Sequence, residues 1–396
     1  MKSKLWLAIV SLLFIFCSYQ PDFPKLKYNG LSLVASRDSL KIEHILPLKN
    51  VNANTIALMP FAFLEDLKSP ELHFNNKRQW WGERVGGVQQ SIQLLQRNGL
   101  KVMIKPQIWI WHGEFTGDLN MTSDKDWQTF ENSYLEYILL YAELAEQRQI
   151  SLFCIGTELY NFTEKRPEFW QKMIAEVRNV YSGKITYAEN WDKVDQFQFW
   201  DQLDFIGVDA YFPVSEEENP TEAELSKGWE SHKKMLQNLS SATKKQVLFT
   251  EYGYRNVDFA TKEPWLASSR RRGDELPEYL NEELQVKALQ VIYDEFWPEK
   301  WFAGGFLWKW HHDHERAGGK QNDQFTPQNK MAEKISWTQS RMTRLNDQTE
   351  DISETTLAYN SVTRENIGGF SINNDNMRSV RVWLFIIGSL FLWFLF

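Results

Sequence analysis

The sequence contains very little cysteine. Among its 396 residues there are two, Cys17 and Cys154. If Cys17 is lipidated or removed with a leader segment, Cys154 has no partner and no disulfide can form. An exported protein of this kind must then be stabilised by the packing of its core alone.

The sequence also lacks a basic stripe and a glycine-rich phosphate turn. Its formal net charge is −8, and no Lys- and Arg-rich run alternates with aromatic residues, so we expect no nucleic-acid partner. No glycine-rich turn follows the first predicted strand, which argues against a doubly wound open sheet. An acidic chain of this kind can still bind a neutral polymer.

The N-terminal end has the layout of an export signal. Residues 1–20 combine Lys2 and Lys4 with a 12-residue apolar run from Leu5 to Phe16, which is typical of a secretory signal peptide. Cys17 follows this run and could carry a lipid, although Phe16 is bulkier than a lipidation motif prefers. We expect an exported protein of the cell envelope or the extracellular space, either cleaved, lipidated or anchored.

The C-terminal end combines a polar stretch with a short apolar run. Residues 341–379 are rich in Asn, Thr, Ser, Asp and Glu and predict a flexible tether. Residues 380–396 include a largely apolar stretch from Val382 to Phe396, which as a helix spans about 22 Å, less than the roughly 30 Å of a hydrocarbon core. A short membrane segment, an interfacial anchor and a hydrophobic end bound to a partner all remain open, and we expect membrane association.

Aromatic residues are abundant. The chain has 18 Trp, more rings than a core of this size needs, although most of them are expected to fill the core. Because the flat face of an indole packs well on the apolar C–H patches of a sugar ring, the remaining rings favour a carbohydrate partner.

Eight β-rich runs alternate with helical stretches, the pattern typical of a parallel sheet. The predicted strands are Tyr28 to Ala35, Asn54 to Phe63, Lys101 to Trp111, Ser151 to Leu159, Lys184 to Trp191, Leu203 to Phe212, Gln246 to Tyr254 and Phe302 to Trp310. The predicted helices are Arg84 to Asn98, Asp126 to Gln149, Pro167 to Tyr181, Thr221 to Thr243, Asn281 to Phe296, one after Pro327 and a weakly specified one near Leu40 to Leu48. We therefore predict an α/β protein with a single (β/α)8 barrel within residues 21–340.

Two glutamates end strands of this barrel. Glu158 ends the fourth run and Glu251 the seventh, and barrel enzymes place their chemistry at the carboxyl ends of the strands. Cleaving a glycosidic bond requires a protonated acid and an ionised carboxylate, which retaining enzymes hold about 5 to 5.5 Å apart. The pair therefore predicts a sugar-cleaving enzyme.

Other strand ends should face the same cleft. They contribute Trp109, Trp111, His112, Asn190, Trp191, Asp209, Tyr211, Tyr254, Trp308 and Trp310. Glu189 is a less favoured rival acid, and buried Lys105 needs either an ion pair or a substrate contact. The cluster His311, His312, Asp313 and His314 does not have metal-ligand spacing, so a substrate contact is favoured over an ion. Trp80, Trp81 and Trp265 are either distal sugar platforms or loop anchors, and Arg270 to Arg272 a solvated turn.

Four motifs carry a more specific resemblance. Gly30-Leu-Ser-Leu-Val, Ile155-Gly-Thr-Glu158-Leu, Phe249-Thr-Glu251-Tyr-Gly-Tyr and Gly305-Phe-Leu-Trp308-Lys-Trp310 resemble glycoside hydrolase family 113, a clan A group of endo-β-1,4-mannanases. The resemblance covers about Tyr28 to Trp337 and implies a retaining double displacement without a cofactor, with Glu158 as acid/base and Glu251 as nucleophile.

The resemblance also implies roles for neighbouring residues. Tyr211 would orient the nucleophile by a hydrogen bond, and a Trp of the eighth strand, Trp308 in preference to Trp310, would form the floor of the −1 subsite. Thr157 stands where many clan A members have an Asn that binds the sugar 2-hydroxyl, so Asn190 is the candidate for that contact.

Two alternatives accompany this interpretation. Another clan A β-glycanase, such as a β-glucanase, would have the same carboxylates, and a surface glycan-binding protein could keep the barrel without turnover. The presence of both carboxylates favours catalysis on β-mannan or a related β-glycan, and the oligomeric state stays open.

Overall fold

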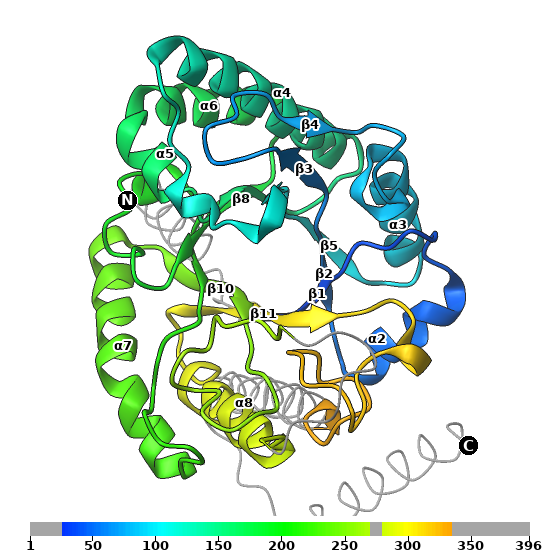
Figure 1. The fold of residues 1–396 in the computed structure, drawn as a ribbon, viewed down its shortest axis with the longest axis vertical. Helices are drawn as coiled ribbons and strands as arrows, with labels where there is room; N and C mark the ends of the chain where they lie inside the picture. Colours follow the sequence, from blue (N-terminus) through cyan, green and yellow to red (C-terminus); the bar gives the residue numbers. More distant parts are fainter. Residues whose placement is uncertain (1–25, 270–278, 335–396) are drawn as a thin grey trace, which may run out of the picture. The chain divides into compact units, whose positions relative to one another are not determined.

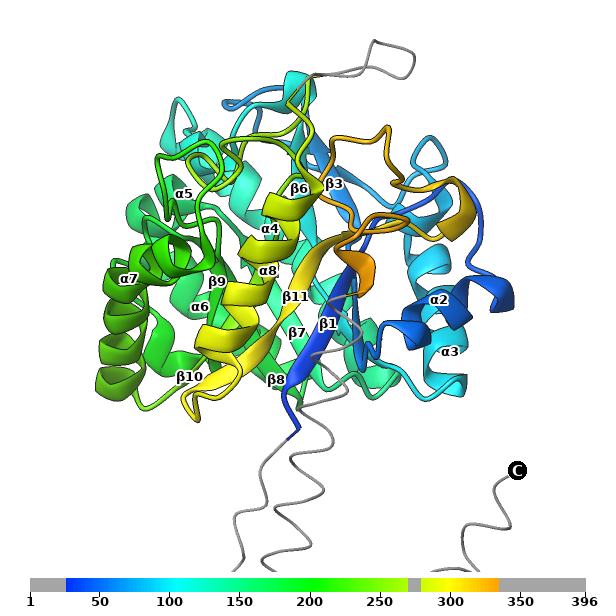
Figure 2. The ribbon, with the colours of Figure 1, turned by 90° about the horizontal axis from the view of Figure 1, so that it is seen from below.

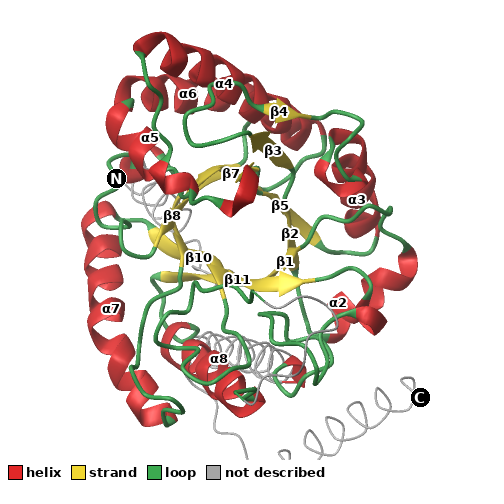
Figure 3. Ribbon diagram, in the orientation of Figure 1, coloured by secondary structure: helices red, strands yellow, loops and turns green. Residues whose placement is uncertain are grey.

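A closed barrel of eight parallel strands forms the centre of the protein (Figures 1 and 3). The computed structural model describes residues 26–269 and 279–334. Around the barrel the strands follow the order β1-β11-β10-β9-β8-β7-β5-β2. Their bounds are β1 Tyr28–Leu33, β2 Thr55–Leu58, β5 Lys101–Ile104, β7 Leu152–Thr157, β8 Lys184–Asn190, β9 Phe205–Asp209, β10 Gln246–Tyr252 and β11 Phe302–Trp310. The predicted single barrel is thereby confirmed.

Helices surround the barrel on its outside (Figure 1). The α-helices are α2 Ile45–Asn50, α3 Val85–Arg97, α4 Asp124–Gln147, α5 Tyr160–Lys165, α6 Pro167–Val180, α7 Glu222–Thr243 and α8 Glu282–Phe296. The short 3-10 helices are η1 Ile42–His44, η2 Trp81–Glu83, η3 Trp111–Gly113, η4 Thr116–Asp118, η5 Trp200–Gln202 and η6 His314–Arg316. The five well-specified helices match their predictions to within about two residues, and the weak first one consists of η1 and α2.

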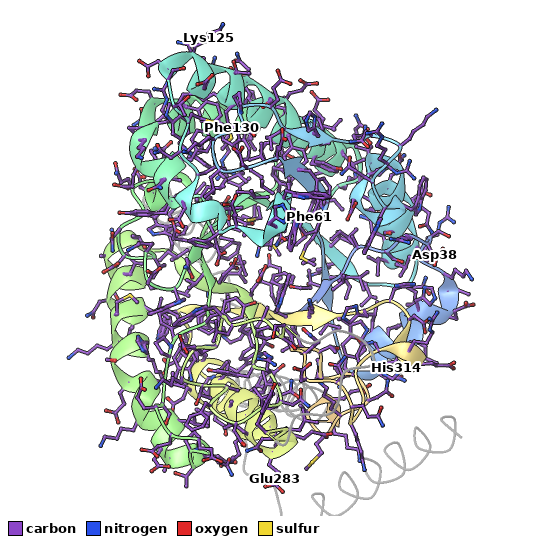
Figure 4. The ribbon with its side chains drawn as sticks, in the orientation of Figure 1. Asp38, Phe61, Lys125, Phe130, Glu283 and His314 are labelled. Carbon is purple, nitrogen blue, oxygen red and sulfur yellow. The ribbon has the colours of Figure 1, made fainter. Side chains whose placement is uncertain are left out.

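Local signals in the sequence explain where these helices begin. Thr221 caps α7 by accepting a hydrogen bond from the Glu224 backbone while Glu224 reaches back to Thr221, a capping box. Pro167 opens α6 at a position where no backbone N–H is needed. On α4, buried rings at helical spacing, including Phe130 (Figure 4), pack toward the barrel.

Two predicted strands are each broken into two. The continuous runs expected at Asn54 to Phe63 and Lys101 to Trp111 are wrong as single strands, because β2 is followed by a separate β3 Phe61–Leu64 and β5 by a separate β6 Gln107–Ile110. Pro60 and Pro106 occupy the breaks, where a residue without a backbone N–H cannot continue a ladder. Beyond the breaks, β3 and β6 join β4 His73–Phe74 in a three-stranded sheet of order β4-β3-β6. Figure 2 shows β3 and β6 at the end of the barrel to which β1 and β11 run.

The barrel interior has a small core of its own. Ala57, Met103, Leu152, Cys154, Ala188, Leu248 and Phe306 pack there, apart from the larger layer between strands and helices. Cys154 is buried as a free thiol. The interior below the strand ends is therefore apolar and closed, which leaves the carboxyl end as the place for polar chemistry.

Several predictions lie outside the described residues. These concern the signal at residues 1–20 with Cys17, the tether at 341–379, the apolar tail at 380–396 and the turn Arg270 to Arg272. The helix predicted after Pro327 falls mostly beyond residue 334. Within residues 26–269 and 279–334, no helix combines the length and apolar character needed to cross a membrane.

Candidate active site

A cleft of about 1980 Å³ opens at the carboxyl end of the strands. Barrel strand ends, the β4-β3-β6 sheet and the loops after β8 and β10 contribute to its walls. Pockets for compact small molecules usually measure about 300–1,000 Å³. The cleft is therefore large enough for an extended ligand of several rings.

Most of the predicted site residues line this cleft. They are Trp109, Trp111, Glu158, Asn190, Trp191, Tyr211, Glu251 and Trp308, together with Asp209. The two glutamates thus come together from β7 and β10, as their positions at strand ends predicted.

Tyr254 and Trp310, which were also predicted to face the cleft, do not line it. Both side chains are almost completely buried in the core. For Trp310 the reason is an irregularity in β11: its register against β1 pairs Leu31 with Leu307 but Leu33 with Trp310. One extra residue in a strand turns the following side chains toward a different side, so Trp308 faces the cleft and Trp310 does not.

Glu251 lies among hydrogen-bond donors. Its Oε1 accepts from Lys105 Nζ at 2.5 Å and from Gln107 Nε2 at 3.1 Å. Its Oε2 accepts from the Tyr211 hydroxyl at 2.8 Å, which confirms the hydrogen bond expected for Tyr211. Every one of these partners donates, so both oxygens of the Glu251 carboxylate are held by hydrogen-bond donors.

Lys105 connects Glu251 to a second carboxylate. The Lys105 side chain is completely buried where β5 ends, and its Nζ lies 3.0 and 3.1 Å from the two oxygens of Asp209. The Thr250 hydroxyl donates to the same carboxylate at 2.7 Å. Burial opposes the lysine charge, but Asp209 and Glu251 together raise the pKa of Lys105 above its ordinary value. Of the two readings of Lys105, the structure shows the ion pair.

Asp209 is held in an environment that resists its ionisation. Burial and the negative charge of Glu251 raise the pKa of Asp209 to about 7, against the opposing effects of Lys105 and Thr250. Asp209 therefore adds a negative charge to the site, and the extent of its ionisation changes with pH around neutrality.

Glu158 has the opposite surroundings to Glu251. Burial first, and then the negative charges of Asp209 and Glu251, raise the pKa of Glu158 well above its ordinary value, with Lys105 opposing. Its backbone is left-handed, with φ of 51°, a strained conformation for a residue with a side chain that is typical of functional sites. The backbone N–H donates to the Ala188 carbonyl at 2.8 Å, and the Thr116 hydroxyl donates to the Glu158 carbonyl at 3.2 Å. The backbone of Glu158 is thus held in place, and the surroundings of its carboxyl group favour the protonated form.

Aromatic side chains form much of the cleft wall. Trp191 and Trp265 stack with ring centres 5.5 Å apart and planes inclined by 17°. Trp80 and Trp265 line the cleft, as a sugar platform requires, whereas Trp81 does not. Lys309 Nζ lies 5.4 Å from the centre of the Trp308 ring, so the strand that supplies the indole also supplies a cation.

Two polar side chains, Asn190 and Thr157, line the cleft together with Glu158. Asn190 Oδ1 accepts from the Trp191 backbone at 2.9 Å, which fixes the amide in the cleft wall. Thr157 also lines the cleft, and its hydroxyl is buried without a hydrogen-bond partner among the described residues. The Asn190 amide and the Thr157 hydroxyl therefore share the cleft wall with Glu158, where either could contact a ligand.

The rival assignments are accounted for by other contacts. Glu189 is buried, does not line the cleft, and accepts from the Asn190 backbone at 2.9 Å; burial raises its pKa to about 8. His312 Nε2 lies 3.3 Å from Ser36 Oγ and His314 Nε2 2.6 Å from Glu333 Oε1. Across the described part of the chain, no group of three or more His, Cys, Asp or Glu could hold a metal ion.

Sequence reasoning missed two residues of the site. Gln107 contacts Glu251 directly. The sequence signal that could have identified it is Pro106, because this residue ends the barrel strand β5 and lets β6 begin at Gln107 beside the cleft. Lys309 stands between Trp308 and Trp310 in a quoted motif, but an alternating pattern alone places it on the other face. Its position in the cleft wall depends on the irregular end of β11.

Comparison with known proteins places these features in context. A sequence profile described as "Glycoside Hydrolase Family 113" matches residues 35–330. The sequence matches none of the curated proteins.

The structure also resembles solved structures. One is described as a complex of a family 113 β-1,4-mannanase, with a TM-score of 0.66 and 21% identity, covering 80% of this chain and 99% of the other. The β-mannanase AaManA from Alicyclobacillus acidocaldarius, in complex with ManMIm, has a TM-score of 0.66 and 21% identity, with 82% and 99% covered. A β-glucuronidase from Faecalibacterium prausnitzii has a TM-score of 0.52 and 13% identity, with 80% and 49% covered. At these identities the likeness shows the shared barrel fold.

Proposed function

The chain belongs to glycoside hydrolase family 113, and from that premise we propose that it hydrolyses β-1,4-linked mannan by a retaining double displacement. Glu251 attacks the anomeric carbon while Glu158 protonates the departing oxygen, and Glu158 then activates the water that releases the sugar.

The contrast between the two carboxylates carries this proposal. Glu251 accepts hydrogen bonds from Lys105, Gln107 and Tyr211, so its charge is available for attack. Burial and neighbouring anions raise the pKa of Glu158, so its proton is available for the leaving group. A carboxyl group whose surroundings favour its protonated form, facing a carboxylate held by hydrogen-bond donors, is the usual arrangement of an acid and a nucleophile.

The nature of the cleft supports an extended, neutral substrate. Its walls hold Trp80, Trp191, Trp265 and Trp308, whose faces suit pyranose rings. We assign β-1,4-mannan because two related structures of the same family are described as β-mannanases. Within the proposal, Asn190 and Thr157 bind the sugar beside Glu158, and Trp308 forms the floor at the cleavage point.

Hydrolysis by the full chain tests the proposal. Release of reducing ends is measured on β-1,4-mannan, β-glucan and xylan for the parent protein, Glu158→Gln and Glu251→Gln. We expect activity on mannan and a loss of about 10²-fold or more in each variant, since both groups act in the transition state.

Glu189→Gln is the matched control, because it changes a buried glutamate of the neighbouring strand that does not line the cleft. It should keep most of the activity. Full activity of Glu251→Gln would rule out our nucleophile, and cleavage of β-glucan in place of mannan would reassign the substrate. A parent protein that binds a β-glycan without cleaving any would contradict the proposed hydrolysis.

A further inference from the structure

The three-stranded sheet beyond the barrel has one face in the core and one in the cleft. On the core side, Ala62 and Ile110 are buried, and Phe74 packs against Tyr137 with ring centres 5.1 Å apart. On the other side, Phe61, Phe63, His73, Gln107 and Trp109 line the cleft. The sheet is thus a wall whose inner face is fixed and whose outer face is open to a ligand.

The strand register arranges the cleft face in two rows. Phe61 pairs with Gln107, and Phe63 pairs with both Trp109 and His73. The first row contains Gln107, which donates to Glu251 Oε1 at 3.1 Å. The second row, His73-Phe63-Trp109, lies two residues farther along the strands, at about 7 Å. We call this second row the outer platform.

The outer platform is aromatic across all three strands. Adjacent strands are about 4.8 Å apart, so three neighbouring side chains cover roughly 10 Å. Phe63 and Phe61 lie with ring centres 6.3 Å apart, which joins the platform to the row beside Glu251. Figure 4 labels Phe61 at the edge of the barrel opening. Aromatic rings therefore follow one another along β3, from the row that contains Gln107 to the outer platform.

Exposure distinguishes the platform from a core. Trp109 is 49% exposed, and Trp111, directly after β6, is 61% exposed. Large exposed rings that gather in one place mark a binding surface, because leaving them in water is unfavourable. Since neither ring is needed to close the barrel, packing does not explain them.

We propose that the outer platform, extended by Trp111, binds pyranose rings of the same glycan chain at positions distal to the cleavage point. This inference rests on the proposed function for the chemical class of the ligand. The indole and phenyl faces contact the apolar C–H side of a ring, while the His73 imidazole at the edge of the row offers a polar contact to a hydroxyl. The platform acts only on chains long enough to reach it.

The dependence of activity on chain length tests the platform. Values of kcat/KM are measured on β-1,4-mannooligosaccharides from two to six units for the parent, Trp109→Ala and Phe63→Ala, with Tyr279→Ala as a control. Tyr279 is 46% exposed and does not line the cleft. We expect the parent value to rise with chain length, and Trp109→Ala to lose about tenfold on the longest substrate while the shortest one cleaved is unchanged. The control should follow the parent at every length.

Two results would overturn the platform. Trp109→Ala could equal the parent at all lengths, or it could lose the same factor at all lengths, which would place Trp109 at the cleavage point. If the parent cleaves none of these substrates, the proposed function fails. Calorimetric binding of mannohexaose then decides the platform separately: weaker binding by Trp109→Ala supports it, and unchanged or absent binding contradicts it.

Discussion

At the scale of the single residue, the site shows how two glutamates acquire different roles from their neighbours. Donors surround Glu251, whereas burial and the charges of Asp209 and Glu251 act on Glu158. Lys105 is the cation common to both effects, since it contacts Glu251 and Asp209 and lowers the pKa of Glu158. The other titratable groups that face Glu251 are Tyr211 and, from β11, Lys309.

Removing the Lys105 charge should move the pH profile to higher pH. In Lys105→Met, Glu158 loses the cation that opposes the rise of its pKa, so the acid keeps its proton to higher pH. We expect the alkaline limb of kcat/KM on β-mannan to shift upward, as measured from pH 3 to 10.

The double variant Lys105→Met/Asp209→Asn is the control for folding, because it also removes the buried Asp209 carboxylate that Lys105→Met leaves without its cation. Because loss of the Asp209 charge lowers the pKa of Glu158, its alkaline limb should lie below that of Lys105→Met. If kcat/KM falls in both variants while both limbs of its pH profile stay in place, Lys105 contributes only to packing.

Asp209→Asn alone should move the alkaline limb in the opposite direction from Lys105→Met. The ionised Asp209 raises the pKa of Glu158, so without that charge Glu158 loses its proton at lower pH. We expect the alkaline limb to move downward while Lys105 stays paired with Glu251. An unchanged or higher alkaline limb, measured on the same substrate, would show that Asp209 does not influence the acid.

Residue-level patterns in the sequence identified the carboxylates and most of the cleft wall, but not all of it. Glu158, Glu251, Tyr211 and Trp308 could be predicted because a strand end fixes which end of the barrel they reach. Trp310 could not, since one irregularity in the register of β11 reverses which way its side chain faces. Tyr254 lies beyond the end of β10, and its side chain is buried in the core.

At the scale of the element, strands that leave the barrel build the cleft. Pro60 and Pro106 end β2 and β5 as barrel strands, and the chain continues as β3 and β6 in a second sheet. The hydrophobic pattern runs through both breaks, so periodicity alone predicted one long strand in each case. The prolines were the signal, but their effect depends on the curvature of the closed barrel, which a local pattern does not contain.

The packing of α7 provides a test of element-level contacts. A Cβ at Gly228 would lie 1.8 Å from the Val214 carbonyl oxygen, in the chain that follows β9. Gly→Ala within a helix normally stabilises by about 0.5–1 kcal/mol. Here we expect Gly228→Ala to destabilise the protein by about 1–3 kcal/mol, because helix and backbone must separate.

Thermal or urea unfolding measures this change. Lys227→Ala is the control, because it alters an exposed neighbour in the same helix and should leave stability nearly unchanged. If Gly228→Ala proves as stable as the parent or more so, the close approach of α7 to Val214 is wrong.

At the scale of the whole molecule, the barrel separates an interior filled by buried side chains from an open cleft that holds the carboxylates. The fold could be predicted because eight alternating strand and helix signals recur along the chain and agree with one another. The size of the cleft could not, since it depends on loops and on the second sheet.

The reactivity of Cys154 reports on the integrity of the barrel. Its thiol is buried inside the strands, and burial raises its pKa to about 12. We expect iodoacetamide to modify it only when the barrel unfolds, at a rate that rises steeply across the urea transition. Peptide-resolved mass spectrometry separates it from Cys17. Rapid modification in native buffer would show that the interior opens without global unfolding.

The stereochemistry of the first product tests the central claim most directly. Proton NMR of β-1,4-mannohexaose with the full chain follows the new reducing end before mutarotation. Attack by Glu251 followed by water inverts the anomeric carbon twice, so the first-formed product should be the β-anomer. An α-anomer as the first product would mean a single displacement by water and would contradict Glu251 as the nucleophile.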